Sequence, residues 1–462
     1  MKKYIINGGK PLKGEVTISG AKNAVVGMIP ATILADSPCT LENVPDIADV
    51  KLMIDILHKL GAEAYYKAPG VLYIDPTHIN KTCVPKKLAE KMRASYYFVG
   101  ALLSKHKAAR AALPGGCSIS EAGRGVDMHV TAFKALGAEV KIKENESACQ
   151  QEQTDVQSQE QNSSDKKIDK SEGTIIAKAT ELRGAPIAFE KPSVGATINT
   201  MLCACKIKGV TTIKNAAKEP HIVDVANFLN SMGANIRGAG TDVIRIIGVD
   251  SLKGSTYTVI PDQIEAGTYM IMAAATKGDV LIKNVIPRHM ECLTTKLVEM
   301  GVGVELMDLG IGVEDGVDDT IRVYYKGRPK ATDIVAVPYP GFPTDLQAQT
   351  AALLTIADGT STVTETIWTS RFKYTAELMK MGADILVSKD NKTAQIRGVD
   401  TLTSPNPPML EATDLRAGAA LIIAGLMTEG TTEITEIHHV ERGYEKLIEK
   451  INAMGGDIRK EG

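Results

Sequence analysis

Aromatic residues and excess charge are both scarce in this chain of 462 residues. One tryptophan, six phenylalanines and 13 tyrosines leave few surfaces on which the bases of a single strand could stack. Lys and Arg number 53 against 55 Asp and Glu, so the formal charge is −2 and no basic footprint is evident. The composition therefore argues against a nucleic-acid partner.

Long hydrophobic runs are also lacking. The longest, Ala417–Met427, is too short to cross a bilayer. At the start, Met1–Ile6 meets the polar turn Asn7–Pro11 before a signal region could form. We therefore expect no export signal, no membrane insertion and a cytoplasmic location.

Cysteine clusters and nucleotide motifs are missing as well. The seven cysteines are scattered, and Cys203 and Cys205 lack metal-ligand spacing and lie in an apolar helical pattern, which favours buried packing. A reducing compartment fits this usage. No Walker motif occurs and no GxGxxG follows a strand, so nucleotide hydrolysis and NAD chemistry are unsupported.

Glycine, by contrast, is abundant, and its 41 copies reveal a repeat. Six Leu-Gly or Met-Gly pairs each end an amphipathic stretch. In the last stretch Tyr444, Leu447 and Ile451 fall at helical spacing. Each glycine is then predicted to take the left-handed conformation that closes a helix. The six are Gly61, Gly137, Gly233, Gly301, Gly382 and Gly455.

A strand-like segment precedes each of these amphipathic helices, and a helix rich in small apolar residues precedes each strand. The pattern predicts six copies of a strand–helix–strand–helix–strand–strand unit. In the second copy it assigns the first helix to Lys87–Ser104 and the following strand to Cys117–Glu121, the position that Cys39 has in the first copy. The polar stretch Glu144–Glu172 is predicted to be a disordered, solvated insertion, with a charged partner-binding loop as the alternative.

The small-residue helices open with polar groups. Ser, Thr and Asp at these positions are explained by helix capping. Capping does not explain Lys22, Lys191 and Arg416, because the helix dipole disfavours cations in a first turn. These three residues therefore suggest an anionic ligand, such as a phosphate or a carboxylate.

The turn Pro114–Cys117 is the sharpest local feature. A thiol on a glycine-rich turn, followed by Arg124 and Asp127, can be tuned for acid or nucleophile chemistry. Cys39 lacks such neighbours, so a chemical and a packing role both remain open for Cys117. His129 alone is more typical of a structural histidine.

Six ordered motifs together resemble one family over nearly the whole chain, the UDP-N-acetylglucosamine enolpyruvyl transferases of bacteria. The motifs are Ser19–Asn23, Met92–Ser95, Pro114–Cys117, Pro192–Thr197, Gly341–Asp345 and Thr413–Arg416. The resemblance implies an α/β fold of two inside-out domains, each of three βαβαββ repeats, with the active site in the cleft between them. One domain would comprise 22–260, and the other would join 1–21 to 261–462.

The resemblance also implies an activity. The family transfers enolpyruvate from phosphoenolpyruvate to the 3′-hydroxyl of UDP-N-acetylglucosamine and releases phosphate, by addition and elimination through a tetrahedral ketal. This is the first committed step of peptidoglycan synthesis. The resemblance further implies that the substrates are small molecules of the bacterial cytoplasm, and that no metal, cofactor or obligate protein partner is needed.

Site residues follow from the same resemblance. Cys117 would donate a proton to the methylene carbon, and Asp345 would take the proton of the sugar hydroxyl. Lys22, Arg124 and Arg416 would bind the phosphate and carboxylate of phosphoenolpyruvate. The remaining substrate-binding residues would be Asn23, Arg93, Gly125, Val126, Asp127, Met128, Lys191, Pro192, Ser193, Val194, Ile367 and Arg371.

Two departures from the family pattern accompany this resemblance. The family places an Arg-Pro pair five residues after the cysteine, whereas here Arg124-Gly125 comes two residues later, and Gln263 stands where arginine is common. Three alternatives follow: the sister enzyme that makes enolpyruvylshikimate phosphate, a duplicate with another hydroxyl acceptor, and a catalytically silent sugar-nucleotide binder. The first is disfavoured by Lys22-Asn23-Ala24, since that enzyme would show Lys-Ser-x-Ser-x-Arg near the first helix.

Overall fold

The computed structural model describes residues 2–113, 126–144, 173–307 and 320–462. Within these ranges the chain forms six four-stranded sheets that share one strand order. In each sheet the first strand of a unit lies parallel to the second, and the two final strands lie antiparallel. The repeating unit predicted from the glycine pattern is therefore confirmed as the building block of the fold.

Three units are continuous in the chain. The second contains β6 (Cys83–Val84), α4 (Tyr97–His106), β7 (Ala108–Ala112), α5 (Asp127–Ala135), β8 (Glu139–Glu144) and β9 (Gly173–Lys178). The third contains β10 (Pro186–Ala188), α6 (Val194–Ala204), β11 (Val210–Lys214), α7 (Pro220–Ser231), β12 (Asn235–Arg237) and β13 (Val243–Ile247). The fifth contains β18 (Ile334–Ala336), α10 (Thr344–Leu354), β19 (Thr360–Glu365), α11 (Tyr374–Lys380), β20 (Asp384–Val387) and β21 (Thr393–Arg397).

In each of the other three units, one strand comes from a distant part of the chain. The first contains α1 (Lys22–Ala31), a 3-10 turn η1 (Thr32–Leu34), β3 (Cys39–Glu42), α2 (Ala48–Leu60), β4 (Glu63–Ala68), β5 (Val71–Asp75) and the late strand β14 (Thr256–Thr258). The fourth contains β2 (Lys13–Thr17), α8 (Gln263–Ala275), β15 (Asp279–Lys283), α9 (Pro287–Glu299), β16 (Gly303–Met307) and β17 (Thr320–Tyr324).

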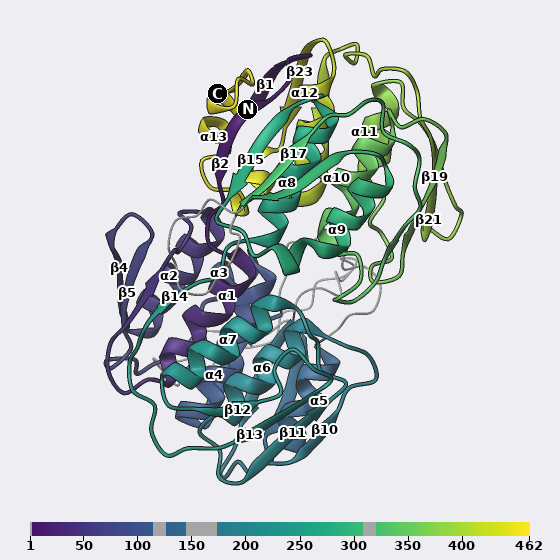
Figure 1. Cartoon of the computed structure of the whole chain (residues 1–462). Coiled ribbons are helices and arrows are strands. Elements are labelled where there is room, and N and C mark those ends of the chain that lie inside the picture. The colour runs from purple at the N-terminus through teal and green to yellow at the C-terminus, as the bar shows by residue number, and fades with distance from the viewer. Residues whose placement is uncertain (1, 114–125, 145–172, 308–319) are drawn as a thin grey trace, which may run out of the picture.

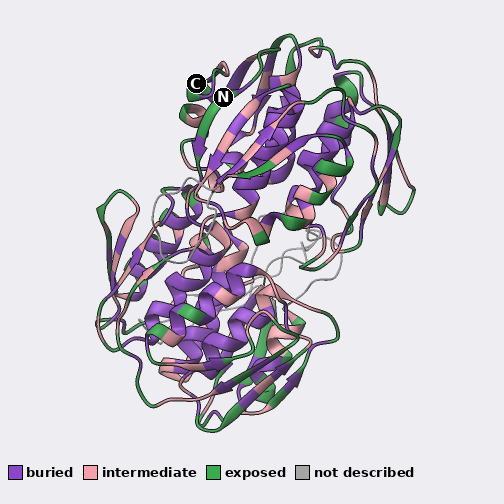
Figure 2. Cartoon of the chain, viewed as in Figure 1, coloured by how far each residue is buried: buried purple, intermediate pink, exposed green. Residues whose placement is uncertain are grey.

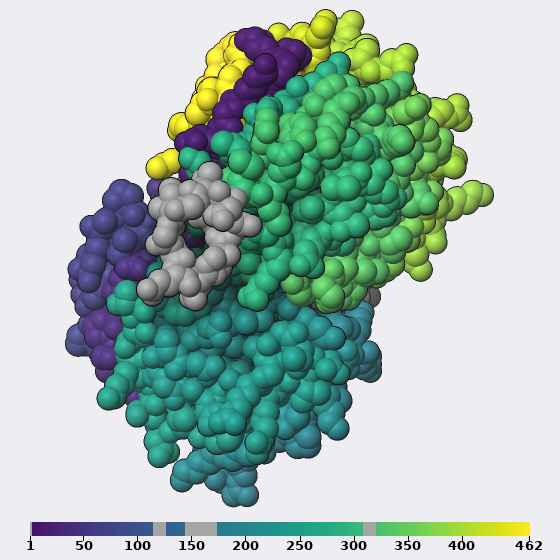
Figure 3. Space-filling view, viewed as in Figure 1, coloured from purple at the N-terminus to yellow at the C-terminus, as the bar shows by residue number. Residues whose placement is uncertain are grey.

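The sixth unit is closed by the first strand of the chain. It contains β22 (Met409–Glu411), α12 (Leu415–Met427), β23 (Gly430–Thr435), a 3-10 segment η3 (Ile437–Arg442), α13 (Leu447–Ala453), β24 (Ile458–Glu461) and β1 (Lys3–Gly8). Strand β1 lies between β23 and β24, so the N-terminal segment sits beside the C-terminal one (Figure 3).

Two hydrophobic cores divide these units. One is built from residues between 21 and 259, which we call the first domain, and the other from residues 4–18 and 264–458, which we call the second domain. Figure 1 shows them as two bodies, with α1–α7 in the lower one and α8–α13 in the upper one. The chain passes between them twice.

The first helix of each unit lies inside its domain. Helix α12 buries every residue from Arg416 to Leu426, and α8 buries Ile264 to Ala275. Helices α8, α10 and α12 pack on one another, and Figure 2 shows them as the purple interior of the upper body. A helix that is apolar all round belongs in a core, so the sheets lie outside and the inside-out α/β fold class is confirmed.

Two further expectations concern the same apolar helices. Cys203 and Cys205, at the end of α6, are fully buried, and burial raises the pKa of both thiols, so the prediction of buried packing is confirmed. Ala417–Met427 belongs to the core helix α12. In the part of the chain that is described, no helix has both the length and the apolarity that a bilayer crossing would need.

All six predicted helix-closing glycines have positive φ angles. The values are 110° at Gly61, 97° at Gly137, 104° at Gly233, 83° at Gly301, 87° at Gly382 and 85° at Gly455. Side chains other than glycine adopt this region at a cost. The prediction from the repeated Leu/Met-Gly pairs is therefore confirmed at every copy.

The second unit departs from the expected boundaries. Its second strand is β7, which pairs with β6 and β9, so the assignment of Cys117–Glu121 to that position and the equivalence of Cys117 with Cys39 are wrong. The helix expected over Lys87–Ser104 is broken into α3 (Lys86–Ala89), a 3-10 turn η2 (Arg93–Tyr96) and α4. The Ser95 hydroxyl donates to the Ala89 and Met92 carbonyl oxygens, a side-chain bond that competes with a regular helix.

The two crossings between domains run side by side as a short ribbon. Gly20 bridges to Pro261, and the Ala21 amide donates to the Ile260 carbonyl oxygen at 2.7 Å. A Cβ atom at Gly20 would lie 1.6 Å from the Asn43 carbonyl oxygen, so only glycine fits there. The ribbon leads directly into the N-termini of α1 and α8, which therefore start at the boundary between the domains.

The predicted insertion Glu144–Glu172 lies outside the described residues except for Glu144, which ends β8, so its predicted start is one residue too early. The strands on either side of 145–172 are paired. Glu144 at the end of β8 lies directly opposite Gly173 at the start of β9. A two-residue Asn-Gly turn can join strands in this register. We expect replacement of 145–172 by Asn-Gly to shift the melting temperature by less than about 3 °C, which corresponds to roughly 1 kcal/mol.

The control for this deletion is Ile175→Asp in β9, whose side chain is fully buried and whose replacement is expected to destabilise the domain strongly. Differential scanning calorimetry of both variants provides the measurement. A deletion variant that melted as early as the Ile175 variant would show that 145–172 contributes to the folded core.

Candidate active site

The N-termini of α1, α8, α10 and α12 lie at the boundary between the two domains. Lys22 is the first residue of α1, Asp345 the second of α10 and Arg416 the second of α12. Capping is confirmed at three positions, where the Asp262, Asp414 and Ser193 side chains accept hydrogen bonds from the backbone of α8, α12 and α6. Asp345 is the second residue of its helix, and its carboxylate accepts hydrogen bonds from two arginine side chains instead of capping the helix.

Asp345 is held by two arginines of its own domain. Its Oδ1 atom lies 2.9 Å from Arg371 Nη2, and its Oδ2 atom lies 2.9 Å from Arg416 Nη2. Both arginine side chains are buried, at 6% and 8% exposed. Burial alone would raise the pKa of Asp345, but Arg416 and then Arg371 outweigh it and hold that pKa well below its usual range. A carboxylate in this state is ionised and weakly basic.

Lys22 approaches the same group from the first domain. Its charge contributes to the low pKa of Asp345, and the charge of Arg416 acts in turn on the pKa of Lys22. The Lys22 ammonium forms an ion pair with Asp49 at 2.6 Å. Burial lowers the pKa of Lys22, while Asp49 opposes that shift. Two of the predicted anion-binding cations, Lys22 and Arg416, are thus brought together with Asp345.

Lys191 does not fit the expected pattern of first-turn cations. It lies two residues before Ser193, the cap of α6, and its side chain is exposed. The prediction of a cation inside the first turn is therefore wrong here, because α6 begins at Val194 and Lys191 precedes its cap. Pro192 and Val194 flank the cap and are half-buried.

A turn after β19 contains a further set of predicted residues. The buried Glu365 carboxylate accepts from the Ile367 amide at 2.7 Å and the Trp368 amide at 3.1 Å, and from the Thr344 hydroxyl at 2.7 Å. This carboxylate fixes the turn to the first residue of α10. Ile367 and Asp345 consequently occupy neighbouring positions in the second domain.

Trp368 connects this turn to the first domain. The guanidinium of Arg93, in η2, lies 5.3 Å from the centre of the indole ring. Sequence reasoning missed both Trp368 and Glu365. The available signal was that Trp368 is the single tryptophan of the chain and directly follows Ile367.

Residues predicted to line a sugar-nucleotide site surround the N-termini of α5 and α6, two helices that pack together. Val126 precedes α5, Asp127 starts it with an exposed side chain, and Met128 follows. A Cβ atom on Gly195 would lie 3.2 Å from the His129 ring, so the two helix starts nearly touch.

His129 serves the packing of these helices. Its Nδ1 atom lies 3.0 Å from Asn199 Nδ2, and its ring packs edge-on against Tyr96. Burial lowers the pKa of His129 to about 3, so the ring is neutral at physiological pH. These contacts support the structural interpretation of this histidine.

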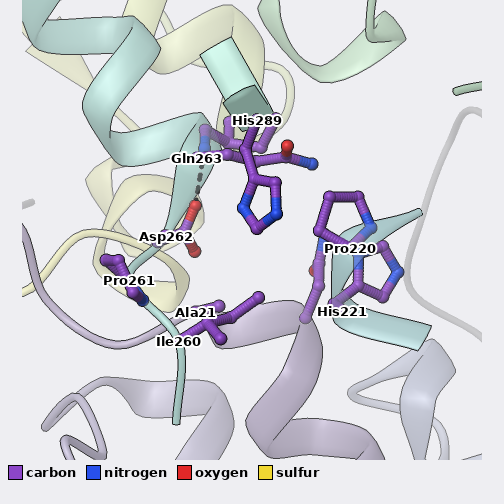
Figure 4. Close-up of a pocket in the computed structure, with 10 residues that line it drawn as sticks. Ala21, Pro220, His221, Ile260, Pro261, Asp262, Gln263 and His289 are labelled. Atoms are coloured by element: carbon purple, nitrogen blue, oxygen red, sulfur yellow. Dashed lines mark hydrogen bonds between the residues drawn. The ribbon is translucent and has the colours of Figure 1, made fainter. Parts of the chain in front are cut away.

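Gln263, the departure from the family pattern at the start of α8, lines a small pocket between the domains (Figure 4). The pocket is also lined by Asn23 of the first domain. His221 and His289 also line it, and burial lowers the pKa of each to about 4. Two neutral imidazoles and an amide therefore line this side of the site.

Cys117, Arg124 and Gly125 lie outside the described residues, as does the altered stretch Ser120–Gly123.

The Glu365 carboxylate leads to a stability prediction. In Glu365→Gln an amide nitrogen replaces one acceptor in a buried position that two backbone N–H groups and a hydroxyl approach. Leaving buried groups unsatisfied costs about 1–3 kcal/mol. We expect a lower melting temperature and a red shift of tryptophan emission, because Trp368 loses its anchored turn. The exposed Glu429→Gln should change neither, and an unchanged emission spectrum in Glu365→Gln would contradict the anchoring role.

Comparison with known families agrees with this arrangement. The profile described as EPSP synthase (3-phosphoshikimate 1-carboxyvinyltransferase) matches residues 6–162 and 159–451. The chain is 50% identical to a protein named UDP-N-acetylglucosamine 1-carboxyvinyltransferase 3 from Caldanaerobacter subterraneus subsp. tengcongensis, covering 99% of each chain. It is also 50% identical to a UDP-N-acetylglucosamine 1-carboxyvinyltransferase from Clostridium botulinum, again covering 99% of each.

Solved structures show the same fold. The enolpyruvyl transferase NikO from Streptomyces tendae aligns over 100% of this chain and 99% of its own, with a TM-score of 0.80 and 24% identity. An EPSP synthase from Acinetobacter baumannii aligns over 100% of both chains, with a TM-score of 0.70 and 17% identity. At these identities the likeness concerns architecture alone.

Proposed function

The chain belongs to the EPSP synthase family of enolpyruvyl transferases, and we propose that it transfers enolpyruvate from phosphoenolpyruvate to the 3′-hydroxyl of UDP-N-acetylglucosamine, with release of phosphate. Support for the acceptor comes from the full-length relatives at 50% identity that are named for this substrate. Support for the chemistry comes from one observation above all. Arg416 binds the Asp345 carboxylate at 2.9 Å, and the charge of Lys22, from the opposite domain, helps to lower the pKa of the same carboxylate.

The reaction forms one carbon–oxygen bond, breaks another and requires proton transfers in both steps. In the addition step the 3′-oxygen of the sugar bonds to C2 of phosphoenolpyruvate, its proton passes to Asp345, and Cys117 protonates C3 to complete a ketal. In the elimination step the Cys117 thiolate takes a proton back from C3, the C2–phosphate oxygen bond breaks, and the leaving phosphate takes up the proton held by Asp345. Lys22, Arg124 and Arg416 offset the charge of the phosphate and the carboxylate throughout.

Asp345 must gain basicity for its part in this scheme. While Arg371 and Arg416 both bind its carboxylate, its pKa stays low and it accepts a proton poorly. The carboxylate of phosphoenolpyruvate competes for Arg416 as a second anionic partner. Each contact that Arg416 transfers to the substrate raises the proton affinity of Asp345, so the base is activated when the substrate is in place.

The sugar nucleotide is bound by the other predicted residues. Lys191 and the start of α6 offer a cation and backbone N–H groups to the diphosphate. Trp368, which Glu365 fixes together with Ile367, faces Arg93 from the other domain, so an acceptor bound there contacts both domains. We place this reaction in the bacterial cytoplasm, as the first committed step of peptidoglycan synthesis, with small-molecule substrates and no obligate protein partner.

The test of the proposal is phosphate release from phosphoenolpyruvate with and without UDP-N-acetylglucosamine. Release that depends on the sugar nucleotide, with formation of the enolpyruvyl ether seen by mass spectrometry, is expected. Release that ignores this acceptor but responds to shikimate 3-phosphate or another alcohol would replace the proposed substrate. Binding of the sugar nucleotide without any release would identify a silent binder.

Two substitutions test the assigned chemical roles. We expect Cys117→Ala and Asp345→Ala each to abolish turnover, because each removes a proton-transfer group, while UDP-N-acetylglucosamine still binds by calorimetry. General acid–base groups contribute about 10²–10⁴-fold to rate. Turnover at the wild-type rate in either variant would overturn the role of that residue.

Tryptophan fluorescence offers a direct report on acceptor binding. Because Trp368 is the single tryptophan and packs against Arg93, we expect its emission to change on titration with UDP-N-acetylglucosamine. Arg93→Leu should weaken this response and raise the KM for the sugar nucleotide. The exposed Arg459→Leu, in β24, is the matched control and should behave as wild type. A response of unchanged affinity in Arg93→Leu would remove Arg93 from the acceptor site.

A further inference from the structure

Lys22 is held by a carboxylate that also contacts the opposite domain. Its partner Asp49, in the first turn of α2, has a side chain only 4% exposed. On the other side of this carboxylate lies Arg442, the last residue of η3 in the second domain. Arg442 Nε lies 2.8 Å from Asp49 Oδ1, and its Nη2 lies 3.4 Å from Oδ2. One buried carboxylate therefore links Lys22 of the first domain to Arg442 of the second.

The segment around Arg442 contacts the first domain at a second point. Three residues further on, Glu445 accepts from the Asp46 amide at 2.9 Å, just before α2. The same carboxylate accepts from the Ser19 hydroxyl at 2.8 Å, on the ribbon between the domains. Residues 442–445 therefore lie against the start of α2, and contact between the domains brings Arg442 to Asp49.

The charges of these three groups decide what Lys22 can offer to an anion. Lys22 and Asp49 alone form a neutral pair, and the carboxylate would repel an approaching phosphate. Adding Arg442 gives the cluster a net charge of +1. Truncating one partner of a buried, hydrogen-bonded charge pair leaves the other charge uncompensated, which is costly. Arg442 thus preserves the cationic character of Lys22 while Asp49 fixes its position.

We propose that Asp49 and Arg442 are positioning residues that act through Lys22, so that the contact of Arg442 with Asp49 prepares Lys22 for the anionic substrate. The inference rests on the proposed function, in which Lys22 binds phosphoenolpyruvate. It extends that function by giving the contact between domains a role in substrate affinity. Neither residue needs to touch the substrate.

The test is steady-state kinetics of Asp49→Asn, Arg442→Gln and the double variant, with both substrates varied. Each single variant is expected to raise the KM for phosphoenolpyruvate about tenfold or more, with the KM for UDP-N-acetylglucosamine changed less than about twofold. Because Arg442 acts through Asp49, the double variant should be no worse than Asp49→Asn by more than about twofold. Arg442→Lys, which keeps the charge, should recover most of the loss.

The matched control is Glu445→Ala. It removes the neighbouring contact between the same two segments but leaves Asp49, Arg442 and Lys22 unchanged, so the KM for phosphoenolpyruvate should stay within about twofold of wild type. Melting temperatures of all variants separate loss of folding from loss of affinity. An equal rise in KM in Glu445→Ala, or fully additive effects in the double variant, would overturn the proposal.

The kinetic results distinguish a failure of the proposed function from a failure of the positioning role. If the wild-type chain releases no phosphate with phosphoenolpyruvate and UDP-N-acetylglucosamine, the proposed function fails. If the wild type turns over and folded Arg442→Gln and Asp49→Asn variants keep its KM for phosphoenolpyruvate, only the positioning role fails.

Discussion

A largely apolar helix that is buried around its whole circumference can be stable in water only when other elements surround it, and the whole architecture depends on this constraint. Helices α8, α10 and α12 satisfy it by packing on one another, and α1, α4 and α6 do the same in the first domain. The sheets are consequently displaced to the outside. The polar N-termini of the core helices then emerge together at the boundary between the domains, which is where Lys22, Asp345 and Arg416 meet.

Buried charges at this boundary are stable because each has a partner. Asp345 is matched by Arg371 and Arg416, and Asp49 by Lys22 and Arg442. Both clusters carry one more cation than anion, so the site attracts an anion although the chain as a whole has a formal charge of −2. Local pairing rather than total charge therefore governs the chemistry, and a substrate anion would act by redistributing these contacts.

Much of the fold was predictable because it is encoded locally. The six Leu/Met-Gly pairs predicted six helix ends, since only glycine adopts the required φ without cost. Core helices such as α12 could be placed from their apolar residues alone. The errors arose where tertiary contacts override local pattern: Ser95 breaks a helix through its hydroxyl, and β7 takes a strand position that sequence similarity assigned to Cys117. Lys191 was misplaced because it lies before the Ser193 cap of α6, not in the first turn of that helix.

The sequence by itself determined the repeated unit, the helix-closing glycines and the family resemblance, and it supplied the candidate site residues, because each depends on short-range pattern or on motifs of fixed spacing. Only the tertiary structure decided that β1 closes the sixth unit and β14 the first, since strand pairing over hundreds of residues leaves no local signal. It alone placed Trp368 against Arg93 and Arg442 against Asp49. Electrostatic partners are set by distance in space, and that distance exists only once the two domains have packed together.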